Sequence, residues 1–506
     1  MKENALKECI RFALENGYQI TDDAFKLLVE LSKVRDPLEI LREVVTNMRN
    51  FKAESFIIER ETIEKFTEKQ DSLESRTLVT EDLEKVTYFH AKDVRPRIEV
   101  LEDPTGKIKT SGTVEDYVRY FVSRFRKIER ILRSRSDFRD AMPISEALKL
   151  PVKSRVKTIC MVTDKKGKKS RIDLIVEDLK GEARVTVTSN SKKEVLEKAK
   201  KIMLDQVVGI EAVKLSEDFF KVEDIIFPEL PNRRQNSSED DIYVVLMSDL
   251  HVGSKEFMEK EFNEFLSWLN LKRGDEFSRE IARKVKYLVI AGDLIDGVGV
   301  YPNQEKDLEI PDIYDQYEEV ARLLSKVPKH IPIIAIPGNH DASRKSLPQP
   351  AIPSEYAAKL YKLENFYSLG NPSIVRLHGV EFLIYHGRSL DDVLSSVPNL
   401  SFTQPEQAMK LLLQARHLAP IYGGKTPIAP EESDHLVIER IPDVFHAGHV
   451  HVNGSCRYRG TLIINSGTWQ RQTEYQRMMG LNPTPGIVTL LNLKTLQTIT
   501  MNFSQS

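Results

Sequence analysis

The stretch IPIIAIPGNHD, residues 331–341, joins a run of apolar residues to a polar tail. Its branched aliphatic side chains predict a buried strand, and Gly338 lets the backbone turn sharply where that strand ends. The tail then presents Asn339, His340 and Asp341, side chains that bind metals or transfer protons. A buried strand that ends in reactive groups predicts an α/β domain with a site at the strand ends.

Four other stretches follow the same plan. They are YVVLMSDLH at 243–251, YLVIAGD at 287–293, FLIYHGR at 382–388 and VFHAGHVH at 444–451. Because ligands in open α/β sheets gather beyond the carboxyl ends of the strands, we expect all the polar tails to meet at one site. Each motif alone is a weak signal, since Asp, Asn and Gly also stabilise ordinary turns. Their ordered combination is what indicates a functional centre.

The side chains in these tails are carboxylates, imidazoles and one amide. Side chains alternate along an extended segment, so Asp-x-His and His-x-His can each offer two ligands to one centre. A nitrogen and oxygen ligand set without thiolate suits manganese, iron or zinc. Enough ligands are present for two ions that share a carboxylate, and two ions about 3.5–4 Å apart can clamp a phosphoryl group during displacement.

Composition excludes several classes of protein. The chain has 506 residues, with 74 Lys and Arg against 76 Asp and Glu, a formal net charge of −2. Binding of nucleic acid by bulk charge is therefore excluded, although a local basic patch is not. No apolar run approaches the ~18 residues of a membrane span, and the N-terminus lacks the apolar segment of a secretory signal. The three cysteines lie far apart, which favours a reducing, cytoplasmic compartment.

The ordered pattern D-x-H, G-D, G-N-H-D, H and G-H-x-H resembles that of the calcineurin-like metallophosphoesterases. The resemblance implies a β-sandwich flanked by helices and two divalent ions, with manganese as the first choice. It assigns Asp249, His251 and His451 to one ion and Asn339, His386 and His449 to the other, with Asp293 as the bridge. It also makes His340 a catalytic histidine that binds no metal, and Asp341 the group that orients it.

Four further segments resemble the small subunits of archaeal family-D DNA polymerases. They are PQPAIP at 348–353, RHLAPIYGGKTPIAP at 416–430, NSGTWQ at 465–470 and NPTP at 482–485. The resemblance, over about 96–503, implies a metal-dependent 3′–5′ exonuclease that proofreads for a large polymerase subunit, acting on DNA 3′ ends near the nucleoid. Arg388 and Lys425 are candidates for substrate phosphate contacts, and ordinary surface charges are at least as good an interpretation. Alternatives are a structural scaffold for the polymerase and a free-standing phosphoesterase or repair nuclease.

The pattern along the chain predicts four parts. Residues 1–50 read as a small helical module, either a docking module for another replication protein or a solvated helical cap with no partner. The Glu-, Lys- and Ser-rich stretch 51–95 reads as a flexible linker. In 96–235, three strand-like runs, a helix near 191–203 and two more runs have the order of an OB-fold barrel. Residues 241–506 form the phosphoesterase domain. Lysines crowd the first hairpin of the barrel and are as consistent with a solvated loop as with nucleic-acid contact: Lys165, Lys166, Lys168 and Lys169.

A helix that begins after Thr113 adds a second basic feature. Its outer face is expected to carry Arg119, Arg124, Arg126, Lys127, Arg130, Arg133 and Arg135. Its apolar stripe must pack on the barrel, which leaves these side chains facing outward. We therefore expect this face to dock the large subunit, with DNA as the alternative partner.

Overall fold

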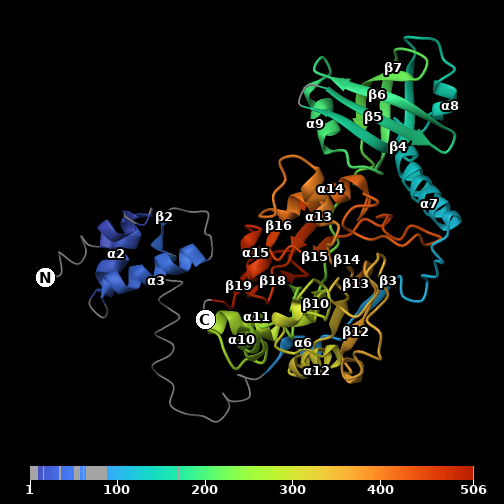
Figure 1. The fold of residues 1–506 in the computed structure, drawn as a ribbon. Helices are drawn as coiled ribbons and strands as arrows, with labels where there is room; N and C mark the ends of the chain where they lie inside the picture. Colours follow the sequence, from blue (N-terminus) through green and yellow to red (C-terminus); the bar gives the residue numbers. More distant parts are fainter. Residues whose placement is uncertain are drawn as a thin grey trace. The chain divides into compact units, whose positions relative to one another are not determined.

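The computed structural model describes residues 9–14, 16, 18–32, 36–50, 57–60, 62–63, 88–168 and 171–504. The chain divides into two compact units, Met1–Thr87 and Tyr88–Ser506. Figure 1 colours the ribbon along the sequence, from blue at the N-terminus to red at the C-terminus. No helix among the described residues is both long enough and apolar enough to span a membrane.

The N-terminal unit is a helical module with a two-stranded parallel sheet. Its helices α2 (Asp22–Leu31) and α3 (Pro37–Asn50) begin at Thr21 and Asp36, whose side chains accept main-chain N–H bonds. Strands β1 (Gln19–Ile20) and β2 (Ile57–Ile58) pair beside them. Ile58 and Ile63 are fully buried in this core, so the module extends past the predicted boundary at residue 50. The remainder of the predicted linker up to residue 87 lies outside the described residues.

The second unit begins earlier than the sequence predicted. Helix α6 (His90–Asp93) lies against strand β10 (Val285–Ala291), because the buried Lys286 Nζ donates to the Ala91 carbonyl at 3.0 Å. Strand β3 (Ile98–Glu102) then pairs antiparallel with β13 (Ser373–Leu377). These residues were expected in the linker and the barrel domain. They join the sandwich instead because Val94 and Ile98 pack into its core.

The predicted barrel is present. Strands β4, β5, β6, β8 and β7 close a barrel in that order, with α9 between β6 and β7 in sequence. Their bounds are β4 (Arg155–Lys168), β5 (Arg171–Asp178), β6 (Gly181–Thr188), α9 (Lys193–Lys201), β7 (Val207–Lys214) and β8 (Phe219–Ile226), with α8 (Ile144–Ala147) beside them. Lys165 is not a free surface charge, since its Nζ donates to the carbonyls of Lys200 and Ile202 at 2.8 Å. Lys169 lies outside the described residues.

The rest of the unit is built on two six-stranded sheets. One has the order β12-β11-β10-β9-β18-β19 and the other β16-β17-β15-β14-β13-β3. The strands are β9 (Tyr243–Met247), β10 (Val285–Ala291), β11 (Ile333–Ile336), β12 (Phe366–Ser368), β14 (Val380–Ile384), β15 (Val444–Ala447), β16 (Gly454–Tyr458), β17 (Thr461–Asn465), β18 (Ile487–Asn492) and β19 (Thr498–Asn502). One buried cluster takes residues from both sheets, among them Val289 and Phe382. The sheets therefore face each other across a common core.

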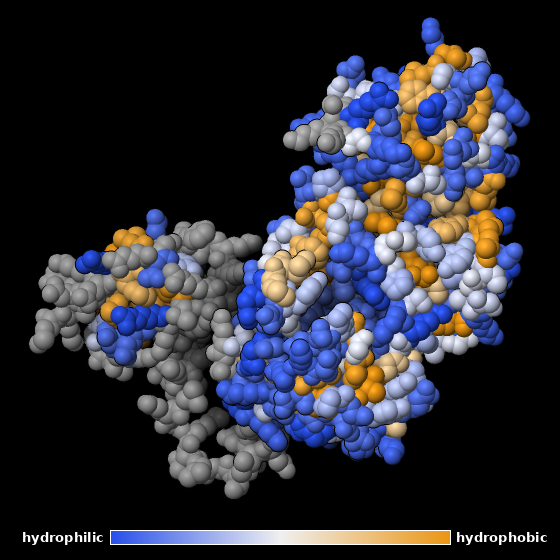
Figure 2. Space-filling model, viewed as in Figure 1, coloured by the Kyte–Doolittle hydropathy of each residue, from blue (hydrophilic) through white to orange (hydrophobic). Residues whose placement is uncertain are grey.

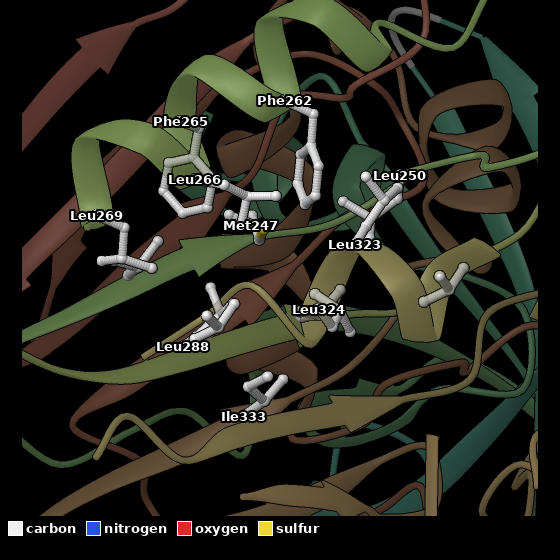
Figure 3. Packing of buried hydrophobic residues seen from close by; sticks show 14 of the residues in the cluster. Met247, Leu250, Phe262, Phe265, Leu266, Leu269, Leu288, Leu323, Leu324 and Ile333 are labelled. Atoms are coloured by element: carbon white, nitrogen blue, oxygen red, sulfur yellow. The ribbon is translucent and has the colours of Figure 1, made fainter. Parts of the chain in front are cut away.

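Helices cover the outer faces of this sandwich. Helices α10 (Glu259–Leu269), α11 (Glu276–Arg283) and α12 (Ile313–Leu324) pack on the first sheet, where Phe265 and Leu324 meet Leu288 of β10 (Figure 3). Helices α13 (Leu390–Ser396) and α14 (Pro405–Ala415) pack on the second sheet. The short elements are η1 (Gln304–Lys306), η2 (Leu360–Lys362) and α15 (Glu474–Met478). The predicted α/β domain flanked by helices is thus present.

Helix α7 (Val114–Arg133) corrects one expectation. It begins, as predicted, in a capping box between Thr113 and Asp116. Arg124, however, is fully buried, whereas the sequence placed it on the outer face. Its guanidinium donates to Asp434 at 2.9 Å, to the Pro420 carbonyl at 2.7 Å and to the Tyr120 hydroxyl at 2.9 Å. Arg124 therefore ties α7 to the segment that precedes the last histidine motif.

Candidate metal centre

The polar tails meet because the strands before them are neighbours. Strands β9, β10 and β11 are parallel and adjacent, so their carboxyl ends place Asp249, Asp293 and Asn339 along one edge of the first sheet. In the second sheet β14 and β15 are also parallel and adjacent, which brings His386 beside the G-H-x-H tail. The site lies where the carboxyl ends of the two sheets come together, as the sequence predicted.

The first ligand group is compact and buried. Asp249, His251 and His451 each offer one atom, and these atoms lie within 4.8 Å of one another. The two imidazole Nε2 atoms are 3.1 Å apart, and His451 Nε2 is 3.4 Å from Asp249 Oδ1. Two ring nitrogens that face each other at this distance need a proton between them or a cation that both bind. The three side chains are those that the resemblance assigns to one ion.

The second group shares a carboxylate with the first. Asp249, Asp293 and His386 also lie within 4.8 Å of one another. Asp293 Oδ2 is 3.3 Å from His386 Nε2 and 3.8 Å from His251 Nε2, so it faces both groups as a bridging ligand must. The Asn339 side-chain oxygen lies 3.0 Å from His386 Nε2. This geometry suits the predicted bridging role of Asp293.

His449 is adjacent to these groups but stands outside them. Its Nε2 lies 3.3 Å from a carboxylate oxygen of Asp391, and its ring packs edge-on against His386 with centroids 5.2 Å apart. Its main-chain N–H donates to Asp249 Oδ2 at 2.9 Å. Six of the seven predicted ligands thus converge directly, and His449 borders them.

Backbone conformation at the site is unusual. Five of the predicted ligands have left-handed φ angles between 52° and 71°: Asp249, His251, Asp293, His449 and His451. Residues other than glycine adopt this region at a cost, and such residues cluster at functional sites. Space is also tight, since a Cβ at Gly338 would collide with Asp293 and one at Gly448 would collide with Asp249. The fold is therefore shaped to aim these side chains.

The rings are held from behind. The Nδ1 atoms of His251, His386 and His451 lie 2.9 Å from the Asp296 carboxylate, a main-chain carbonyl and the Gln476 amide respectively. These contacts fix the ring orientations and leave each Nε2 turned toward the shared space. Together with the facing Nε2 atoms, this donor set fits a pair of divalent cations.

Electrostatics point the same way. Although burial opposes it, the Asp296 hydrogen bond and nearby carboxylates raise the pKa of His251 to about 9. Burial is likewise outweighed at His386, where Asp293 raises the pKa to about 9. Despite burial, the neighbouring histidines lower the pKa of Asp293 well below its usual range. A site that attracts protons this strongly has an excess of negative charge, which a bound cation would neutralise.

His340 and Asp341 differ from each other in role. The His340 Nδ1 lies 2.6 Å from the Asp296 carbonyl oxygen, and burial lowers its pKa to about 4. Asp341 was expected to orient this ring, but its carboxylate accepts hydrogen bonds from Gly338 N, Leu294 N and the Tyr317 hydroxyl. Asp341 therefore stabilises the loop that carries the ligands, and Asp296 orients the ring. Burial and the Asp293 charge raise the pKa of Asp341 to about 6.

The two predicted substrate contacts lie at one side of the centre. Asp391 is the carboxylate beside His449. Burial raises the pKa of Asp391, but the charges of His449, Lys425 and Arg388 outweigh burial and lower that pKa below its usual value. The Arg388 guanidinium donates to the Lys345 carbonyl at 2.9 Å, while Lys425 is exposed. Lys345 Nζ in turn donates to the Asn339 carbonyl at 2.7 Å.

Sequence reasoning missed Asp296, Gln476 and Lys345. Asp296 had a usable signal, because it stands three residues after Asp293 in the same motif, GDLID. Gln476 had none, since it is far in sequence from the His451 that it contacts. Lys345 lies just after the G-N-H-D tail, but a single lysine there has the pattern of an ordinary surface charge.

A family model and a set of similar proteins agree on the family of this chain. The family model for the B-subunits of DNA polymerases alpha and epsilon matches residues 244–453. The DNA polymerase II small subunit of Archaeoglobus fulgidus is 41% identical over 478 residues, 94% of both chains. That of Methanothermobacter thermautotrophicus is 40% identical over 95% of this chain and 97% of its own, and that of Halobacterium salinarum 38% over 80% and 78%. The chain belongs to the family of archaeal DNA polymerase II small subunits.

Proposed function

We propose that this small subunit is a 3′–5′ DNA exonuclease that hydrolyses terminal phosphodiesters with two divalent ions, manganese first. The observation that carries the proposal is the convergence of Asp249, Asp293 and His386 with His251 and His451 in one buried site. A subunit that served only as a scaffold would have no need for five left-handed ligand residues, because such conformations cost stability. The ordered motif set of the calcineurin-like phosphoesterases supports the same chemistry.

The residues have distinct tasks in this reaction. When bound, two divalent ions neutralise the phosphodiester and lower the pKa of a coordinated water. Asp249, His251 and His451 would hold one ion and Asn339, His386 and His449 the other, with Asp293 between them.

His340 would transfer a proton to or from the substrate. Its Nδ1 is engaged by the Asp296 carbonyl, which keeps the proton on that atom and leaves Nε2 to take up or return a proton at the substrate. Arg388 and Lys425 would contact phosphates on the His449 side.

Family membership supports the partners. The relatives are named small subunits, and we propose that this chain binds a large polymerase subunit, which supplies DNA with a 3′ end. The exposed basic residues of α7, such as Arg126 and Arg130, remain candidates for that contact. A role of the N-terminal module in binding other replication proteins stays a prediction.

The test uses the full chain, with and without its large subunit, on a 5′-labelled single strand. Chelation should abolish shortening from the 3′ end and manganese should restore it. His449→Ala should lower bound manganese and activity, whereas His90→Ala, an exposed histidine on α6, should change neither. Activity that survives verified metal removal would refute the proposal, and a chain that binds its partner but never cleaves DNA would leave the scaffold role.

A further inference from the structure

The surface beside the metal centre carries an apolar cluster that the proposed chemistry does not use. Helix α15 and the residue that follows it expose Tyr475, Met478 and Met479, which are 63%, 73% and 60% accessible. Figure 2 shows an apolar patch where Figure 1 labels α15, next to a hollow lined by hydrophilic residues. Three large apolar side chains this exposed on one short helix indicate a binding surface.

This helix is fixed to the metal centre. The side chain of Gln476 lies 2.9 Å from His451 Nδ1, on the ring edge opposite the ligand atom. Thr484 N donates to the His451 carbonyl at 2.9 Å, and Arg471 pairs with Glu261 of α10 at 2.7 Å. The segment is therefore anchored at both ends, and a capping box between Thr473 and Gln476 holds its first turn. Tyr475, adjacent to Gln476 in the chain, is presented from a fixed position at the rim.

We infer that Tyr475, with Met478 and Met479, forms a stacking platform for unpaired bases of a single-stranded nucleic acid. The inference rests on the proposed function. A phosphodiester held at the metals brings its own nucleotides to within one nucleotide of His451, and α15 is the element against that ligand. Aromatic side chains bind bases of any sequence, as an enzyme that trims arbitrary 3′ ends requires. Methionine adds an adaptable apolar contact beside the ring.

A protein partner is the competing occupant of this surface. The continuity of α15 with the ligand His451 favours the nucleic acid, because a protein docked there would cover the approach to the metals. The charges of the helix do not decide between the two occupants, because the exposed Arg477 is accompanied by the exposed Glu474.

The experiment compares full-length wild type with Tyr475→Ala and Tyr475→Phe. The control is Tyr367→Ala, an exposed tyrosine on edge strand β12. The probes are a labelled oligothymidylate and the same oligonucleotide with abasic sugars at its last two 3′ positions. Binding is measured by fluorescence anisotropy, and KM and kcat are measured with manganese.

Tyr475→Ala should weaken binding of the intact strand by roughly tenfold to a hundredfold and raise KM more than it lowers kcat. It should have little effect on the abasic strand, which wild type already binds weakly, and Tyr475→Phe should restore binding. Equal effects on both strands, or no effect, would overturn the platform. Loss only of co-purification with the large subunit would assign the surface to protein docking instead. If wild type cleaves neither strand the proposed function fails, and the anisotropy data alone then decide the platform.

Discussion

Arg124→Met should destabilise the chain far more than substitution of an exposed arginine on the basic helix α7. The guanidinium and its partner Asp434 are both fully buried, so the substitution leaves a carboxylate without its cation. Breaking a buried pair in this way costs about 3–5 kcal/mol. The Tyr120 hydroxyl and the Pro420 carbonyl lose their donor as well, which places the cost toward the upper end.

The assay is thermal unfolding of the full chain, followed by circular dichroism. An unfolding entropy of about 2.1 cal/mol/K per residue over the unit Tyr88–Ser506 corresponds to about 1 °C per kcal/mol, so the midpoint should fall by about 3–6 °C. The matched control is Arg126→Met, an exposed position on the same helix, for which we expect a change within about 0.5 kcal/mol. Arg124→Lys should fall between them, because lysine keeps the charge but lacks the planar fork of donors. Equal unfolding midpoints for Arg124→Met and Arg126→Met would refute the buried ion pair and would show that Arg124 is a surface residue.

Asp296→Asn should lower metal affinity by about 10–100-fold, because it weakens the hydrogen bond that orients His251. The affinity is measured by titration of the metal-free chain, and an unchanged value would show that Asp296 does not support the site. His340→Ala should keep both ions, as counted by metal analysis, and lose about 10²–10⁴-fold in turnover; an emptied site would make it a ligand. The contribution of His417 to stability should fall by about 3 kcal/mol as the pH drops from about 6.5 to 4. Burial lowers the pKa of His417 to about 4, while the unfolded chain still takes up a proton near 6.5. The His417 Nδ1 accepts the Ala419 N–H at 3.0 Å and cannot take a proton without losing that bond; His417→Gln should flatten this pH dependence in urea titrations, and an unaltered slope would contradict it.

Sequence could predict those site residues whose position depends only on the residues next to them in the chain. Asp249, His251 and Asp293 stand directly after apolar runs, and the parallel order of those runs fixes where their tails meet. Asp296 and Gln476 were missed because their roles depend on which histidine ring each one touches, a tertiary contact with no local pattern. The barrel was predictable because its strands are separated by clear turn signals.

The main error of the prediction from sequence was to place a buried charged residue, Arg124, on the surface. Helical periodicity places Arg124 beside the apolar stripe of α7. It does not show whether a carboxylate lies within reach of the guanidinium, because the partner Asp434 is 310 residues away in the sequence. The domain boundary failed for a related reason. The sequence predicted that residues 98–102 lie in the barrel domain, because their partner strand β13 is supplied by the far half of the chain and leaves no local signal.

That pairing has a consequence for synthesis of the chain. Glu99 and Arg376, opposite each other on β3 and β13, are separated by 277 residues, so β3 leaves the ribosome on the order of ten seconds or more before its partner exists. The barrel, complete by residue 226, can close during that wait, while the sandwich cannot. In the meantime β3 is an unpaired edge of sequence IEVLE, and its two glutamates discourage pairing with other nascent chains. The order of the sequence thus makes the barrel the first part of the Tyr88–Ser506 unit able to fold, and the metal centre, whose ligands end at His451, among the last.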